Sequence, residues 1–122
     1  RILEIDPKTE ETVWEYRADN PVDFYSTYIS SAQRLHNGNT LIDEGSTGRF
    51  FEVTPNKEIV WEYINPFYTD SGNRFGRLNA VFRVHRYPLN YPGLEGKKFD
   101  LEAEQPINQL YGYEAMQAAN KM

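Results

Sequence analysis

A stretch of arginines and aromatic residues between Gly72 and Tyr87 holds the side chains best suited to bind an anion. It contains no acidic residue, and its charged and aromatic members are Arg74, Phe75, Arg77, Phe82, Arg83, His85, Arg86 and Tyr87. Guanidinium groups beside aromatic rings suit a planar aromatic anion such as a sulfate or phosphate ester, because they offer bidentate hydrogen bonds and a stacking surface together. The alternative is that these arginines pair with acidic residues elsewhere, such as Glu52, Glu58 or Glu62.

The chain contains two histidines, His36 and His85. His85 shares one face of a predicted strand with Arg83, and a neighbouring cation favours the neutral form of an imidazole. A neutral imidazole can act as a nucleophile or a general base, so we take His85 as a candidate catalytic residue and Arg83 and Tyr87 as candidate substrate-binding residues. The alternative is a structural histidine that is hydrogen-bonded to a carbonyl group. His36 precedes a predicted turn and is expected at an exposed hairpin tip.

Other kinds of catalytic site find little support in the sequence. Two histidines and no cysteine leave too few ligands for the usual zinc or iron–sulfur sites. Asp43 and Glu44 are adjacent on a predicted strand, so their side chains point to opposite faces and cannot form a catalytic pair. The sequence has no phosphate-binding loop, dinucleotide-binding motif, nucleophile elbow or EF-hand. We therefore expect no metal and no cofactor.

Composition predicts a folded protein without affinity for nucleic acid. The 122 residues include 18 acidic and 13 basic side chains, a formal charge of −5, which disfavours nucleic acid as a partner. Aromatic residues make up 15% of the chain, enough large apolar surface to argue against disorder. No apolar run approaches the roughly 18 residues of a membrane span, so none is expected. The length allows one domain at most.

A repeated motif supplies the framework that must position these side chains. Residues 1–16 and 49–63 both run from an arginine, through Asp-Pro or Thr-Pro, to Trp-Glu-Tyr, and the second copy is one residue shorter in its turn. The period is 47 to 48 residues, from Trp14 to Trp61 and from Arg1 to Arg49. Each copy reads as two short strands around a turn, which predicts a β-hairpin. Residues 59–64 are mostly apolar on both faces, which predicts that neighbouring sheets cover this strand.

A further hairpin lies between the two copies. Residues 31–36 and 39–43 flank Asn37-Gly38, which predicts a type I′ turn because that turn needs positive φ at both central residues. Two hairpins per period give four strands, the construction of a β-propeller blade. The predicted fold is therefore all-β, with about two to two and a half four-stranded blades, and a small β-sandwich is the alternative.

The repeat divides the chain into two parts. We expect a partial β-propeller over residues 1–87, including one more strand at 79–87, and a C-terminal wrapping loop and tail over residues 88–122, with a short helix at 114–120. A closed propeller needs about four to eight blades. The chain is therefore expected to be the C-terminal piece of a larger propeller, with the remaining blades or other copies of the chain as its partners.

The repeat resembles that of the bacterial arylsulfate sulfotransferase family. The resemblance rests on Ser-Ser-Ala-Gln-Arg-Leu-His-Asn-Gly-Asn-Thr-Leu-Ile at 30–42, Gly-Arg-Phe-Phe-Glu-Val-Thr-Pro at 48–55 and the two segments that end in Val-Trp-Glu-Tyr, at 6–16 and 59–63. It implies a six-bladed propeller, periplasmic or extracellular, that transfers a sulfuryl group from a phenolic sulfate ester to another phenol without a nucleotide donor. In that family a channel histidine is transiently sulfated, and further histidines and an arginine hold the sulfuryl oxygens.

The resemblance carries over to few residues of this chain. Arg49 stands where the family has its arginine, so we take it as a candidate catalytic residue together with His85. Residues 31–33 stand where the family's histidine would be, so this segment lacks an evident nucleophile. We expect the parent protein to be an arylsulfate sulfotransferase-like enzyme and the isolated chain to be inactive. The alternative is a non-catalytic propeller that binds or assembles partners through Tyr25, Tyr28, Phe67 and Tyr68.

Overall fold

The computed structural model describes residues 1–70 and 76–98. The chain forms two units, Arg1–Arg86 and Tyr87–Met122. Regular structure in the described residues consists of β-strands and short 3-10 helices, which confirms the all-β prediction. The strands are β1 (Ile2–Ile5), β2 (Thr12–Tyr16), β3 (Ser31–Arg34), β4 (Thr40–Glu44), β5 (Arg49–Val53), β6 (Ile59–Ile64), β7 (Thr69–Asp70) and β8 (Arg77–Leu78), and the helices are η1 (Pro21–Asp23), η2 (Gly45–Thr47) and η3 (Pro92–Leu94).

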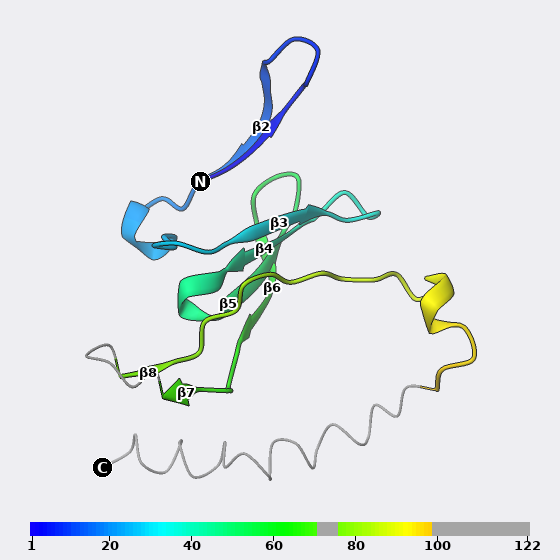
Figure 1. The fold of residues 1–122 in the computed structure, drawn as a ribbon. Coiled ribbons are helices and arrows are strands. Elements are labelled where there is room, and N and C mark those ends of the chain that lie inside the picture. The colour runs from blue at the N-terminus through cyan, green and yellow to red at the C-terminus, as the bar shows by residue number, and fades with distance from the viewer. Residues whose placement is uncertain (71–75, 99–122) are drawn as a thin grey trace. The chain divides into compact units, whose positions relative to one another are not determined.

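The largest element is a four-stranded antiparallel sheet in the order β3-β4-β5-β6, in which each strand pairs with the next along the chain (Figure 1). β1 pairs with β2, and β7 pairs with β8, in two further two-stranded sheets. The sequence predicts about two to two and a half four-stranded blades. Within residues 1–70 and 76–98 there is one four-stranded sheet and the two smaller ones.

The four-stranded sheet has two distinct faces. We call the one that carries Ile42, Phe51 and Val53 the Phe51 face, and the one that carries Leu41, Phe50, Trp61 and Tyr63 the Trp61 face. All of β4 and nearly all of β5 are buried, whereas all six residues of β6 are exposed. The expectation that other sheets cover β6 is therefore not met by the part of the chain that the structure describes.

The hydrophobic core forms where the hairpin β1–β2 meets the Phe51 face. Tyr16 of β2 packs with Ile42, Phe51 and Val53, and its ring centroid lies 5.7 Å from that of Phe51. Phe24, from the connection between β2 and β3, packs against both rings at centroid distances of 5.5 Å and 5.4 Å. Aromatic and branched side chains from three segments thus bury one another, and this burial holds the hairpin to the sheet.

The hairpins β1–β2 and β5–β6 match each other in register. Trp14 pairs with Glu4, and Trp61 pairs with Glu52. In each hairpin the register shifts directly after that glutamate, so the strand that carries the tryptophan bulges at the same place. Two segments 47 to 48 residues apart in the sequence therefore build the same local geometry.

The turn at residues 36–38 differs from the prediction. Leu35 N donates to Asn39 O, and Gly38 N donates to Leu35 O, which closes a three-residue loop. Gly38 has a φ of 87°, but Asn37 does not have positive φ, so the type I′ prediction is wrong. The geometry is that of a type I turn followed by a left-handed glycine. Asn37 Oδ1 accepts from Asn39 N at 3.0 Å, and this local bond favours the observed turn.

The prediction of a strand at 79–87 is also wrong. β8 ends at Leu78, and no strand follows it before η3. Residues 79–86 lie along the Trp61 face. Side chains of β3 form hydrogen bonds with the backbone of this segment, where a strand would be held by hydrogen bonds between two backbones. Val84 N donates to Ser31 Oγ at 3.3 Å, and Arg86 N donates to Gln33 Oε1 at 2.9 Å. Gln33 Nε2 donates in return to Arg86 O at 3.1 Å.

The second unit is described up to Lys98. It contains η3, and the ring centroids of Tyr87 and Tyr91 lie 4.6 Å apart. The predicted helix at 114–120, the end of the wrapping loop, and Arg74 and Phe75 of the arginine-rich stretch lie outside the described residues. Among the residues that are described, no helix has the length and apolarity that crossing a membrane requires.

Candidate functional site

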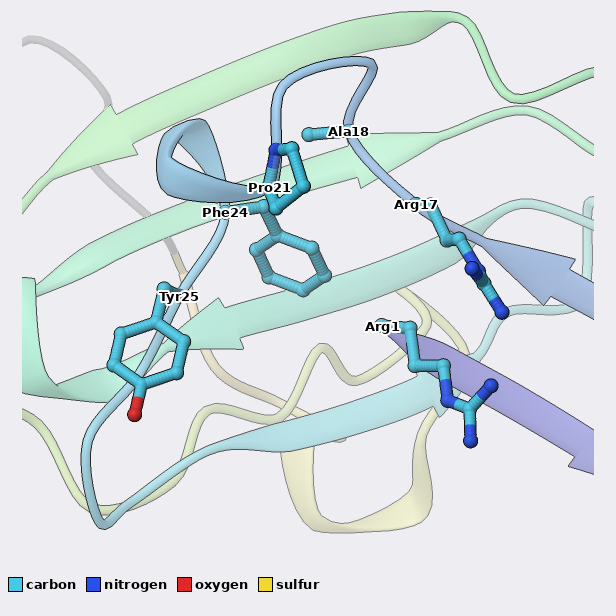
Figure 2. A pocket seen from close by; sticks show the side chains of 6 residues that line it. All are labelled: Arg1, Arg17, Ala18, Pro21, Phe24 and Tyr25. Atoms are coloured by element: carbon cyan, nitrogen blue, oxygen red, sulfur yellow. The ribbon is translucent and has the colours of Figure 1, made fainter.

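The connection between β2 and β3 borders a cavity of about 320 Å³ (Figure 2). It is lined by Arg1, Arg17, Ala18, Pro21, Phe24 and Tyr25. Arg1 and Arg17 come from adjacent ends of the hairpin β1–β2, and both side chains extend in Figure 2 on the side away from Tyr25. The cavity therefore has guanidinium groups at one end and aromatic rings at the other.

A capped helical turn holds the aromatic side of this cavity. Asn20 Oδ1 accepts from Val22 N at 3.3 Å, and Pro21 occupies the first position of η1. Both features favour the start of a helical turn, because the side chain satisfies a free N–H group and proline has none to satisfy. The turn is followed at once by Phe24, whose ring is fixed by the core, and by Tyr25.

The two arginines of the cavity share a single carboxylate. Arg17 Nε lies 2.5 Å from Glu15 Oε1, and Arg1 Nη1 lies 3.6 Å from the same atom. The hydrogen bond from Arg17, with the charges of Arg17 and Arg1, holds the pKa of Glu15 below its ordinary value. Two cations and one anion leave a local positive charge, and the side chains of Arg1 and Arg17 are 57% and 60% exposed. This group can accept an anion.

Arg49, the predicted catalytic arginine, is bound by two carboxylates on the Phe51 face. Its Nη1 lies 3.2 Å from Glu44 Oε2, and its Nε lies 2.5 Å from Glu62 Oε1. Glu44 is 5% exposed and also accepts from Tyr25 N at 3.2 Å. The guanidinium carbon of Arg49 lies 4.4 Å from the centroid of the Phe51 ring. Nε and Nη1, two of the three guanidinium nitrogens that could bind a sulfate, are thus already occupied by protein groups.

Arg49 also lines a second cavity, of about 390 Å³, which shares Arg17 and Ala18 with the first. The structure therefore brings Arg49 close to Arg17, a residue that sequence reasoning missed. A signal for Arg17 exists in the repeat: Trp-Glu-Tyr is followed by Arg17 in the first copy and by Ile64 in the second. Differences between the copies, and not only their similarities, point to this side chain.

Arg49 and His85 do not come together in this chain. Arg49 lies on the Phe51 face, whereas the segment that carries His85 lies along the Trp61 face of the same sheet. His85 and Arg83 are exposed, and so is Tyr87, which belongs to the other unit. His36 is exposed at its hairpin tip, as expected. Catalytic roles for Arg49 and His85, and substrate binding by Arg83 and Tyr87, stay predictions.

The arginine-rich stretch pairs in part with acidic residues, which is the alternative drawn from the sequence. Arg86 forms an ion pair with Glu52, and its guanidinium carbon lies 4.7 Å from the centroid of the Trp61 ring. Burial opposes ionisation of Glu52, but hydrogen bonds from Asn39, Asn37 and Arg86 hold its pKa below the ordinary value. Arg86 is therefore part of the packing on the Trp61 face.

Comparison with known proteins identifies the family. The family described as Arylsulfotransferase (ASST) matches residues 3–76, which is more than half of the 122-residue chain. The chain belongs to the arylsulfotransferase family. The resemblance drawn from the repeat is thus confirmed. No curated protein and no solved structure matches the chain.

The arylsulfotransferase match includes one candidate region and leaves out another. It spans Arg17, Arg49 and the loop around η1, and it ends before Arg83 and His85. Asp43 and Glu44 point to opposite faces of the sheet, as predicted, since they pair with Phe50 and Arg49 respectively. Within the described part of the chain, no group of three or more acidic or histidine side chains could hold a metal ion.

Proposed function

We propose that this chain is part of a propeller enzyme of the arylsulfotransferase family that acts in the periplasm or outside the cell. The enzyme would transfer a sulfuryl group from a phenolic sulfate ester to a phenol without a nucleotide donor. The proposal is supported by the family match over residues 3–76. It is supported further by the cavity beside η1, which combines exposed arginines with aromatic rings.

The cavity suits both parts of a phenolic sulfate ester. Arg1 and Arg17 would bind the sulfate oxygens, because a guanidinium group donates two parallel hydrogen bonds to an oxyanion. Phe24 and Tyr25 offer apolar surface to the phenyl ring. The volume of about 320 Å³ falls in the range of small-molecule sites, roughly 300 to 1,000 Å³.

The chain alone would bind the ester without transferring its sulfuryl group. Transfer requires a nucleophile that bonds to sulfur as the S–O bond to the leaving phenolate breaks. The oxygen of a second phenol then bonds to the sulfur, the bond between sulfur and the nucleophile breaks, and the proton of that phenol passes to a base. Neither of the two histidines, His36 and His85, lines the cavity. We therefore assign the nucleophile to another part of the propeller.

Calorimetric titration of the full chain with 4-nitrophenyl sulfate tests this proposal. Arg17→Gln should weaken binding about tenfold, the loss expected for one hydrogen bond between charged groups. Lys8→Gln removes the same charge at an exposed turn position and should leave binding unchanged. If Arg83→Gln weakens binding and Arg17→Gln does not, the ester binds in the arginine-rich stretch and the cavity beside η1 is not its site.

A transfer assay tests where the nucleophile lies. With 4-nitrophenyl sulfate as donor and phenol as acceptor, the full chain should release no 4-nitrophenol above the uncatalysed rate. Steady release by the chain alone would show that it holds its own nucleophile, and His85→Ala would then identify or exclude that histidine.

A non-catalytic binding propeller is the second candidate function, and exposed aromatic side chains favour it. Tyr25, Tyr28, Phe67 and Tyr68 are 66%, 65%, 44% and 39% exposed. Exposed aromatic surface is typical of protein-binding sites. The two candidates differ in ligand preference: a binding propeller should show no preference for 4-nitrophenyl sulfate over 4-nitrophenol in the titration above.

A further inference from the structure

A separate cavity of about 170 Å³ lies between the hairpin β1–β2 and the strands β3 and β4. We call it the Thr40 cavity, and it has no lining residue in common with the cavity beside η1. It is lined by Ile2, Leu3, Glu4, Trp14, Ala32, Arg34 and Thr40. Ala32 and Arg34 are exposed, so a small molecule can enter from the solvent.

The pairing of β3 with β4 places one unpartnered hydroxyl group in this cavity. Thr40 lies opposite Arg34, and Ile42 lies opposite Ala32, so all four share the Phe51 face. Thr40 is 3% exposed, and its Oγ1 has no hydrogen-bond partner among the described residues. A buried hydroxyl group without a partner is unfavourable. A polar group of a bound molecule would remove this penalty.

The charged residues of the cavity favour a neutral ligand. Glu4 forms an ion pair with Arg34, and Nη1 of Arg34 also donates to Gly38 O at 2.8 Å. The carboxylate and the guanidinium group therefore neutralise each other and leave no net charge beside Thr40. An ionised ligand would lose its hydration without gaining an opposite charge, which disfavours its binding.

The volume and the apolar residues of the cavity limit the size and shape of the ligand. An apolar cavity of roughly 150 Å³ can bind benzene, so about 170 Å³ suits a molecule with one six-membered ring. Ile2 and Leu3 provide aliphatic surface, and Trp14 provides an aromatic surface that can pack against such a ring.

The aromatic wall of the cavity is held in place without a ligand. Nε1 of Trp14 donates to Pro55 O at 3.0 Å, in the turn of the hairpin β5–β6. The guanidinium carbon of Arg34 lies 4.7 Å from the centroid of the indole ring. Binding would therefore not have to order this side chain, and a preformed wall favours affinity.

We propose that the Thr40 cavity binds a neutral alcohol with a single ring. The hydroxyl group of the ligand pairs with Oγ1 of Thr40, which can both donate and accept, and the ring lies against Trp14. The proposal does not depend on sulfuryl transfer, because the two cavities share no residue. It stands if the chain binds no phenolic sulfate ester.

A titration of the full chain with benzyl alcohol, followed by nuclear magnetic resonance, tests this proposal. The chain has two tryptophans, Trp14 and Trp61, so two indole N–H signals report on different faces of the sheet. The signal of Trp14 should shift and saturate at millimolar concentrations, and that of Trp61 should not. Trp61→Phe assigns the two signals. If no signal saturates, the cavity holds only water and the proposal is overturned.

Thr40→Val tests the role of the hydroxyl group, because valine keeps the shape of threonine. The affinity for benzyl alcohol should fall about fivefold, the loss expected for one neutral hydrogen bond. The affinity for ethylbenzene, which has a methyl group in place of the hydroxyl, should not fall. Thr12→Val removes a hydroxyl group from an exposed position of β2 and should change neither affinity. An unchanged affinity of Thr40→Val for benzyl alcohol, or equal losses for both ligands, would overturn the proposal.

Ala32→Leu tests where the ligand binds, because the larger side chain would fill part of the cavity. It should abolish the saturable shift of Trp14 with both ligands, whereas Ala32→Ser, which stays small, should retain it. Ala32 is exposed, so neither substitution disturbs the buried core, and circular dichroism verifies the fold of each variant. Saturable binding that persists in Ala32→Leu would place the ligand elsewhere and overturn the proposal.

Discussion

Nη1 of Arg49 lies 3.2 Å from Oε2 of Glu44, a carboxylate that is almost fully buried. The other oxygen of Glu44 accepts from the backbone N–H of Tyr25, which lines the cavity beside η1. Arg49 is therefore linked through one carboxylate to the loop that forms the candidate site. It can support the cavity as a positioning residue without touching a ligand.

We predict that Arg49→Ala destabilises the chain by about 2 to 3 kcal/mol, because Glu44 would be left as a buried charge without its cation. Chemical denaturation followed by circular dichroism measures this loss. Glu62→Gln provides the control, since the side chain of Glu62 is 48% exposed and its pairing should contribute less than about 1 kcal/mol. Equal effects of the two variants would argue against a special role for the buried pair.

A second prediction concerns Asp43, which is 0% exposed and whose Oδ1 has no hydrogen-bond partner. Burial raises the pKa of Asp43 from 3.8 to about 6, and a hydrogen bond from Ser31 opposes the rise. The folded chain therefore holds this proton to higher pH than the unfolded chain does. Stability from this group is fully present below the unfolded value of 3.8 and is lost as the pH rises through about 6.

Asp43→Asn tests whether the stability contributed by Asp43 falls as the pH rises. The free energy of unfolding of the natural chain, minus that of Asp43→Asn, should fall between about pH 4 and pH 7 by up to about 3 kcal/mol. Glu52, whose pKa is lowered, acts in the opposite direction at acid pH, but it is present in both proteins and cancels in the difference. A difference that stays constant over this range would show that Asp43 is not buried as described.

Gly48 should be intolerant of a side chain for two reasons that can be separated. Its φ is 63°, and a Cβ atom would approach Asn79 O to less than 3.0 Å. Gly76 has a similar φ of 69°, but no atom of the described residues lies within 4 Å of its Cβ position. We predict that Gly76→Ala costs about 1 kcal/mol, from backbone conformation alone, and that Gly48→Ala costs about 3 kcal/mol. Similar losses in thermal unfolding would contradict the close approach of residues 79–81.

Lys57 offers a stabilising substitution. It ends the turn of the hairpin β5–β6 with a φ of 74°, which disfavours a residue that has a Cβ atom. Lys57→Gly should therefore raise the free energy of unfolding by about 0.5 to 1 kcal/mol. Asn56→Gly, one position earlier, lacks this benefit and should lower it, because glycine adds freedom to the unfolded chain. A loss of stability in Lys57→Gly would contradict the left-handed turn.

Much of the fold could be predicted from the sequence because its signals are local. Alternation and turn residues marked the hairpins, and the spacing of Trp14 and Trp61 marked two segments that share a register shift. Residues 79–87 show why local signals are insufficient. Their polar and apolar residues alternate as in a strand, but their backbone forms hydrogen bonds with the side chains of Ser31 and Gln33. No local pattern in the sequence predicts these partners.

The candidate site was less predictable, because its properties depend on pairing across strands. Family resemblance pointed to Arg49. The two carboxylates that pair with it belong to Glu44 of β4 and Glu62 of β6. The neutralisation of its charge therefore depends on how the strands pair, which the residues next to it in the sequence do not show. Arg17 was missed because it lies just after a repeated motif. Its place beside Arg1 becomes visible only when the two ends of the hairpin β1–β2 are brought together.

The order β3-β4-β5-β6 gives the chain a defined sequence of folding events. Each pairing joins neighbours along the chain, so the loops to be closed are short and the sheet should form fast. The hydrogen bonds between Gln33 and Arg86 join residues that are 53 positions apart, so they can form only after the later part of the chain has been synthesised. During synthesis the finished sheet would therefore lack the Arg86 side chain that lies over the Trp61 ring until residues 79–86 are made. Aggregation of this chain should be governed by that interval, and slower translation after Ile64 should increase it.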